Sequence, residues 1–211
     1  MKGLVVFDLD GTLVPEKSSW RRIYERFGIQ EVSDDNFRRF EKGLMSYTEL
    51  VSQTAAELRR AGLKKEDIAS LFKDPHVVDG AAELVDQLKR DGWEVAIISA
   101  GVCDLVRRIA ELLGIEKRFC NEILYDEGGL ISGIKVEVDP SNKGQVLEAL
   151  ARDLNVDKEH VVAVGDHPMD GSMFARAGHY VVVGEDGDVG PRGRRAKSLR
   201  EVSAIIKLWY C

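Results

Sequence analysis

Short apolar runs alternate with segments of helical period along the chain. The runs are rich in Val and Ile and occupy residues 4–7, 95–98, 161–164 and 180–183, which is typical of buried parallel strands. Apolar side chains at helical spacing predict helices over residues 81–88, 102–109 and 146–154. Because strand and helix alternate, the pattern predicts a doubly wound α/β fold with a mostly parallel, Rossmann-like sheet.

Two insertions interrupt this alternation. Residues 15–78 have no strand pattern but carry several helical stripes, so we expect a small helical cap domain there. Residues 1–14 and 79–211 are then expected to form the α/β core domain. Residues 122–138 alternate in polarity on either side of Glu127-Gly128-Gly129, which predicts a β-hairpin with a glycine turn.

Composition and charge exclude several classes of function. The 211 residues are 44% hydrophobic and 31% charged, the composition of a soluble globular protein. A formal net charge of −6 argues against general nucleic-acid binding, which needs a basic surface. The one basic run, residues 192–197, is expected to be a solvated surface loop before a C-terminal helix.

The cysteines and the chain start indicate the compartment. Cys103, Cys120 and Cys211 are odd in number and far apart, without zinc-site or redox-pair spacing, so we expect free thiols in a reducing compartment. The chain opens with Met-Lys-Gly and enters a strand directly, which argues against a signal peptide. No apolar run approaches the roughly 20 residues that span a bilayer. We therefore expect a cytoplasmic protein with no membrane partner.

Two carboxylates follow the first predicted strand directly. Asp8 and Asp10 are two residues apart, so they point the same way at the carboxyl end of the sheet, where α/β folds bind ligands. Two like charges held together are costly unless they share a cation or a proton. A calcium-binding EF-hand loop is excluded, because it needs its glycine at position six and flanking helices, whereas Gly11 is fourth and a strand precedes.

Three further groups are predicted to open onto the same sheet edge. Asp166 and Asp170 follow the strand at 161–164, Ser99 and Gly101 follow the strand at 95–98, and Lys143 begins a helix. Singly, such residues are usually caps, turns or solvated charges. Together they predict a site for Mg²⁺ and phosphate, because Mg²⁺ prefers a few carboxylates together with phosphate oxygens.

In this order the motifs resemble the haloacid dehalogenase superfamily of phosphohydrolases, in particular its phosphoserine phosphatase-like branch. The resemblance covers nearly the whole chain. It implies that Asp8 attacks the phosphorus of a small phosphomonoester, while Asp10 protonates the leaving alcohol and later deprotonates water. It also implies that Asp166, Asp8 and the backbone carbonyl of Asp10 bind Mg²⁺.

The remaining motif residues have physically reasonable roles beside these. Asp8 can approach an anionic phosphate only if charge is neutralised, which Mg²⁺ and Lys143 would do. Ser99, with the backbone at Gly101, would donate to phosphoryl oxygens. Asp170 is expected to orient Lys143 or a metal-bound water.

The chain departs from the phosphoserine phosphatase pattern at several positions. Met169 stands where that branch has an Asn, with His167 just ahead of it. Lys17 stands where the branch has a glutamate for the substrate ammonium, and Thr54 where it has an arginine for the substrate carboxylate. These exchanges predict that phosphoserine is a poor substrate and that Lys17 favours a second anionic or polar group.

Other interpretations stay open at this point. Glu16, Arg59 or Arg60 could take over the missing substrate contacts, which would make the chain a phosphoserine phosphatase proper. A phosphotransferase or phosphomutase of the same fold would share Asp8, Asp10 and the metal site. A non-catalytic binding module is less consistent with the pattern, because unpaired carboxylates destabilise a fold unless they bind something. The oligomeric state is left open.

Overall fold

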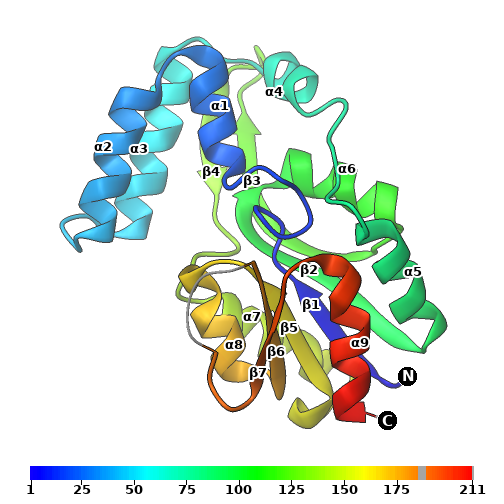
Figure 1. Ribbon diagram of the computed structural model, residues 1–211. Coiled ribbons are helices and arrows are strands. Elements are labelled where there is room, and N and C mark those ends of the chain that lie inside the picture. Colours follow the sequence, from blue (N-terminus) through cyan, green and yellow to red (C-terminus); the bar gives the residue numbers. More distant parts are fainter. Residues whose placement is uncertain (185–188, 211) are drawn as a thin grey trace.

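The computed structural model describes residues 1–184 and 189–210. They form a seven-stranded sheet in the order β4-β3-β2-β1-β5-β6-β7, parallel except for β4 (Figure 1). The strands are β1 (Gly3–Phe7), β2 (Trp93–Val102), β3 (Lys117–Tyr125), β4 (Ile131–Lys135), β5 (Val161–Gly165), β6 (His179–Val183) and β7 (Gly193–Ala196). The predicted doubly wound α/β fold is confirmed.

Helices cover both faces of this sheet, because alternate side chains of each strand point to opposite sides. Leu4 and Val6 of β1 pack with α7 and α8, whereas Val5 and Phe7 pack on the side of α5, α6 and α9. These elements are α5 (Ala81–Arg90), α6 (Cys103–Leu113), α7 (Lys143–Asp153), α8 (Gly171–Arg176), α9 (Leu199–Tyr210) and the short 3₁₀ turns Lys158–His160 and Pro168–Asp170. The result is a three-layer core.

Residues 15–78, all described, are helical as predicted and contain no strand. Their helices are α1 (Ser19–Phe27), α2 (Gln30–Glu41), α3 (Tyr47–Arg60) and α4 (Lys65–Leu71). In Figure 1, α1, α2 and α3 stand beyond the carboxyl ends of the parallel strands. Ile23 and Leu58 belong to the same buried apolar cluster as Phe7, so the hydrophobic core runs unbroken from the sheet into this segment. The division into two domains stays a prediction.

The predicted hairpin is confirmed, but its first strand is longer than expected. β3 begins at Lys117, pairs in parallel with β2 as far as Asn121, and then pairs with β4 in antiparallel register from Glu122. The mixed sequence Lys-Arg-Phe-Cys-Asn lacks the apolar run by which the other parallel strands were predicted. The hairpin reaches up beside α3, which contacts β4 (Figure 1).

The basic run at residues 192–197 is not a surface loop, and this prediction was wrong. Residues 193–196 form β7, the edge strand beside β6. Gly193 and Ala196 are buried while Arg194 is exposed, so backbone pairing rather than an apolar pattern makes the strand. The predicted C-terminal helix is present as α9.

The expectation of free thiols is also wrong for two of the three cysteines. Cys103 at the start of α6 and Cys120 in β3 form a disulfide, with Cα atoms 5.1 Å apart. Both are buried. Pairing of β3 beside β2 brings them together, a contact that their spacing along the chain does not reveal. Cys211 lies outside the described residues.

Reduction of the disulfide is expected to lower the free energy of unfolding by about 3 kcal/mol, because the bridge closes a loop over a separation of 17 residues. Urea denaturation with and without dithiothreitol measures the difference. Cys211→Ser, which leaves the bridge intact, is the matched control and should show the same loss on reduction. Absence of a linked Cys103–Cys120 peptide in a non-reducing digest would contradict the bridge.

Candidate active site

The loop after β1 carries the first two acidic residues to the carboxyl edge of the sheet. The Asp8 backbone N–H donates to the carbonyl of Val164 at 2.9 Å, which ties this loop to the end of β5. Gly11 has φ +82°, and a Cβ at this position would lie 2.4 Å from Asp166 Oδ2. Glycine is therefore required here both for its backbone conformation and for the close approach of a carboxylate.

A buried lysine joins the motifs that follow different elements. Lys143, the first residue of α7, donates from Nζ to Asp8 Oδ1 at 2.7 Å and to Asp170 Oδ1 at 2.6 Å. All three residues are buried. Burial acts to lower the pKa of Lys143, but the two carboxylates more than offset it and raise that pKa above its ordinary value. Lys143 is therefore a fixed cation.

Asp8 is the most strongly perturbed carboxyl of the group. Burial raises its pKa to about 8, the Lys143 ammonium acts in the opposite direction, and the nearby Asp170 and Asp10 carboxylates add to the increase. The Lys143 ammonium, 2.7 Å from Asp8 Oδ1, favours the ionised form of Asp8. A bound cation would act in the same direction as Lys143 and lower the pKa of Asp8.

Three carboxylates lie close enough together to share a metal ion. Asp8, Asp166 and Asp170 each offer an oxygen, and these oxygens lie within 4.8 Å of one another. Asp166 is held by Thr12, whose hydroxyl donates to Oδ1 at 3.0 Å, and by Lys17, whose Nζ lies 2.6 Å from Oδ2. Carboxylate oxygens suit a hard divalent cation, so the donor set fits such an ion.

The predicted anion-binding residues lie inside β2 rather than after it. Pairing of β2 with β3 is irregular between Ile98 and Val102, and Ser99 and Gly101 lie in that stretch. The Gly101 N–H donates to Ser99 Oγ at 3.0 Å. A Cβ on Gly101 would lie 2.4 Å from Ser19 Oγ and 2.7 Å from Asp10 Oδ2, so the strand end packs directly against these groups.

Asp10 is held by a residue that the sequence analysis did not single out. Asp10 Oδ2 accepts from the Ser19 backbone N–H at 3.0 Å and from the Ser19 hydroxyl at 2.8 Å. Asp10 Oδ1 is buried and has no hydrogen-bond partner among the described residues. Burial raises the pKa of Asp10 to about 6, and the Ser19 hydrogen bonds act to lower it.

Of the three predicted substrate residues, only Lys17 reaches the carboxylate cluster. Glu16 forms an ion pair with Arg22 of α1. Thr54 is buried within the helical segment, where its hydroxyl lies 3.0 Å from the Tyr24 hydroxyl. The Thr54 hydroxyl is therefore hydrogen-bonded within the helical segment and does not face the carboxylate cluster.

The other candidate side chains are engaged away from the acidic cluster. Arg59 donates to the Ile131 carbonyl at 2.9 Å and to Asp126 at 3.0 Å, which fastens α3 to the hairpin. Arg60 pairs with Glu57 one helical turn away. His167 is exposed, and its Nδ1 accepts from the Met169 N–H at 3.2 Å within its own turn.

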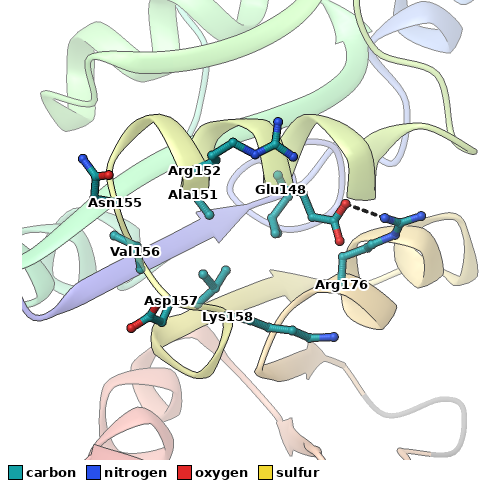
Figure 2. Close-up of a pocket in the computed structure, with 10 residues that line it drawn as sticks. Glu148, Ala151, Arg152, Asn155, Val156, Asp157, Lys158 and Arg176 are labelled. Carbon is teal, nitrogen blue, oxygen red and sulfur yellow. Dashed lines mark hydrogen bonds and ion pairs between the residues drawn. The ribbon is translucent and has the colours of Figure 1, made fainter.

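A surface hollow lies away from this cluster. It has a volume of about 520 Å³ and is bordered by the end of α7, residues 155–158 and Arg176 (Figure 2). Val161, the first residue of β5, lines it, whereas Asp166 follows the last residue of that strand. The hollow is thus at the amino end of the sheet, opposite the acidic cluster, and Figure 2 shows a Glu148–Arg176 ion pair across it.

Comparison with known proteins gives a consistent set of similarities. A family model described as haloacid dehalogenase-like hydrolase matches residues 3–178. A phosphoserine phosphatase of Archaeoglobus fulgidus is 33% identical over 178 residues, which are 84% of this chain and 51% of that protein. One of Methanocaldococcus jannaschii is 31% identical over 178 residues, 84% of this chain and 83% of that protein. The chain thus spans about half of the first relative and most of the second.

Solved structures show the same similarity to phosphoserine phosphatases. A substrate-bound phosphoserine phosphatase complex superimposes with a TM-score of 0.82 at 26% identity, covering 97% of this chain and 98% of that one. A phospho-aspartyl intermediate analogue of phosphoserine phosphatase gives 0.75 at 27% identity, with the same coverage. Within residues 1–184 and 189–210, no helix has the length and apolar character to cross a bilayer.

Lys143→Met should reduce the free energy of unfolding by about 3 to 5 kcal/mol, because it leaves two buried carboxylates without their cation. Urea denaturation in the presence of a chelator measures this loss without a contribution from metal. Lys207→Met is the matched control, since Lys207 is exposed and lies 3.6 Å from Asp91. Equal losses in the two variants would show that the buried network does not hold the fold together.

Proposed function

Because the chain belongs to the haloacid dehalogenase-like hydrolases, we propose that it is a magnesium-dependent phosphatase that hydrolyses a small phosphomonoester through an aspartyl phosphate on Asp8. The match over residues 3–178 confirms the resemblance that the order of the motifs predicted. One observation carries the proposal: the Lys143 ammonium donates a hydrogen bond to Asp8. Asp8 is in turn one of three carboxylates whose oxygens lie within 4.8 Å of one another.

In the first half of the reaction, Asp8 acts as the nucleophile. A carboxylate and a phosphate repel each other, and the buried ammonium of Lys143, 2.7 Å from Asp8 Oδ1, lowers that repulsion where the dielectric constant is small. Asp170 holds Lys143 from the other side at 2.6 Å and so fixes the ammonium in place. Ser99 and Gly101 at the end of β2 are the proposed donors to phosphoryl oxygens, for which the Gly101 N–H would leave its present acceptor, Ser99 Oγ.

Asp10 is the proposed general acid and general base. Its pKa of about 6 lies close to neutral pH, as a group that both gives and takes a proton requires. It protonates the leaving alcohol in the first half-reaction and accepts a proton from the attacking water in the second. The unpartnered, buried Oδ1 is available for both transfers.

Mg²⁺ would be held by Asp8, Asp166 and the Asp10 backbone carbonyl, with Asp170 beside them as the residue that holds Lys143. When bound, it supplies positive charge that neutralises phosphoryl oxygens. Thr12 and Gly11 keep Asp166 in position, one by a hydrogen bond and the other by leaving room for its carboxylate.

The proposed substrate is a small phosphomonoester other than phosphoserine. Lys17, with its side chain 75% exposed, presents an ammonium beside the acidic cluster, where it would repel the amino group of phosphoserine. Thr54 has no positive charge to bind the substrate carboxylate and faces Tyr24 instead. A second anionic or polar group on the substrate would suit Lys17 better.

Asp8→Asn is expected to abolish turnover with folding intact, a loss of at least about a thousandfold in kcat, because it keeps the side chain's shape but removes the nucleophilic charge. Phosphomonoester hydrolysis with Mg²⁺ measures this. Asp153→Asn, at an exposed position at the end of α7, is the matched control and should stay near wild type.

The same assay tests the metal requirement. A chelator should stop wild-type turnover and added Mg²⁺ should restore it, with Ca²⁺ a poor substitute because of its larger, looser ligand shell. Residual Asp8→Asn activity within tenfold of wild type, or equal rates without metal, would refute the proposed function.

Phosphoserine should have a lower kcat/KM than phosphomonoesters that carry a second anionic group, because Lys17 repels an ammonium and no arginine replaces Thr54. Lys17→Glu should shift the ratio of the two kcat/KM values towards phosphoserine, whereas Lys158→Glu, at an exposed position at the amino end of the sheet, should not. If wild-type enzyme instead prefers phosphoserine by tenfold or more, the chain is a phosphoserine phosphatase proper.

A further inference from the structure

Ser19 is fully buried where α1, the loop after β1 and the end of β2 meet. It is the first residue of α1, and its backbone N–H and its hydroxyl both donate to Asp10 Oδ2, at 3.0 and 2.8 Å. The same hydroxyl oxygen accepts from the Val102 N–H at the end of β2, at 3.0 Å. Since a serine hydroxyl has one hydrogen, that hydrogen is committed to Asp10.

This arrangement makes the two oxygens of the Asp10 carboxyl group unequal. Oδ2 receives two donors, which occupy its two in-plane acceptor positions. A proton on Oδ2 would face those donors, so the protonated form carries its proton on Oδ1. Oδ1 is buried and has no hydrogen-bond partner among the described residues, so its hydrogen-bonding capacity is left for a reacting oxygen.

We propose that Ser19 is a positioning residue for general acid and base catalysis, because it anchors Asp10 Oδ2 and so makes Oδ1 the oxygen that exchanges protons with the substrate. The inference rests on the proposed phosphatase function and adds to it a residue that lies outside the four sequence motifs. It assigns the role to the hydroxyl of Ser19 in particular, since its backbone N–H would be present in any residue.

Written out, the two half-reactions use Oδ1 in opposite directions. Asp8 forms a bond to phosphorus, the ester P–O bond breaks, and its electron pair goes to the leaving oxygen, which takes the proton from Asp10 Oδ1. The Ser19 donors stabilise the carboxylate that results. Water then attacks phosphorus and gives a proton to Oδ1, while the electron pair of the breaking P–O bond returns to Asp8 and inorganic phosphate is released.

A purely structural role for Ser19 has a different signature. If its only function were to accept the hydrogen bond from Val102, its removal would lower stability but would affect all substrates alike. The neighbouring Ser18 has such a role, because its side chain accepts from the Arg21 N–H as the N-cap of α1. Ser18→Ala is thus a matched control on the same helix terminus.

The test compares kcat/KM for an alkyl ester, glycerol 2-phosphate, with kcat/KM for p-nitrophenyl phosphate, at saturating Mg²⁺. This parameter covers the steps up to departure of the first product, and p-nitrophenolate leaves without a proton whereas an alkoxide does not. The ratio of the two values cancels any loss of folded enzyme. Wild type, Ser19→Ala, Ser19→Thr and Ser18→Ala are measured, with Asp10→Asn as the limit for complete loss of the acid.

Ser19→Ala should lower kcat/KM for the alkyl ester at least about tenfold more than for the aryl ester. Ser19→Thr, which keeps the hydroxyl, should restore the wild-type ratio, and Ser18→Ala should not change it even if its melting temperature falls. An unchanged ratio in Ser19→Ala with active wild-type enzyme would overturn the role of Ser19 alone. Wild-type enzyme inactive on both esters would overturn the proposed function with it.

Discussion

The constraint on which the site depends is the burial of one ammonium between two carboxylates. Lys143 contacts Asp8 and Asp170 out of reach of solvent, an arrangement that is costly unless each charge is matched at short range. A lysine at the first residue of a helix also opposes the helix dipole, which favours negative charge there. The fold tolerates this because β1, β5 and α7 converge at one sheet edge, where the carboxylates outweigh the dipole.

The strands that could be predicted from the sequence are those whose side chains are apolar on both faces. β1, β5 and β6 lie inside the sheet, so their patterns are continuous, and helices on both faces leave matching apolar stripes. β3 and β7 contain charged residues, and the pairing partner determines them as strands. The pattern of apolar positions along the chain reflects side-chain burial, whereas the backbone pairing of a segment with mixed polarity leaves little trace in it.

The same distinction applies to the site. Asp8, Asp10, Asp166 and Asp170 could be placed together because each follows a predictable strand, and parallel strand ends share one edge. Ser19 could not, because its contact with Asp10 depends on how α1 turns back onto β2. The sequence does contain a hint, because two serines, Ser18 and Ser19, precede Trp20. Only one residue can be the N-cap of α1, and that is Ser18, so the hydroxyl of Ser19 is free to bind another group.

The arginine-rich edge strand has a consequence for association between copies of this chain. An edge strand presents unpaired backbone groups, and a long apolar edge invites another sheet to add to it. β7 is four residues long and has an exposed Arg194, so a second copy docking there would bring like charges together and gain few hydrogen bonds. At the opposite edge, β4 is five residues long and packs beside α3. Both margins of the sheet are therefore poor templates for aggregation, which protects a sheet otherwise rich in Val and Ile.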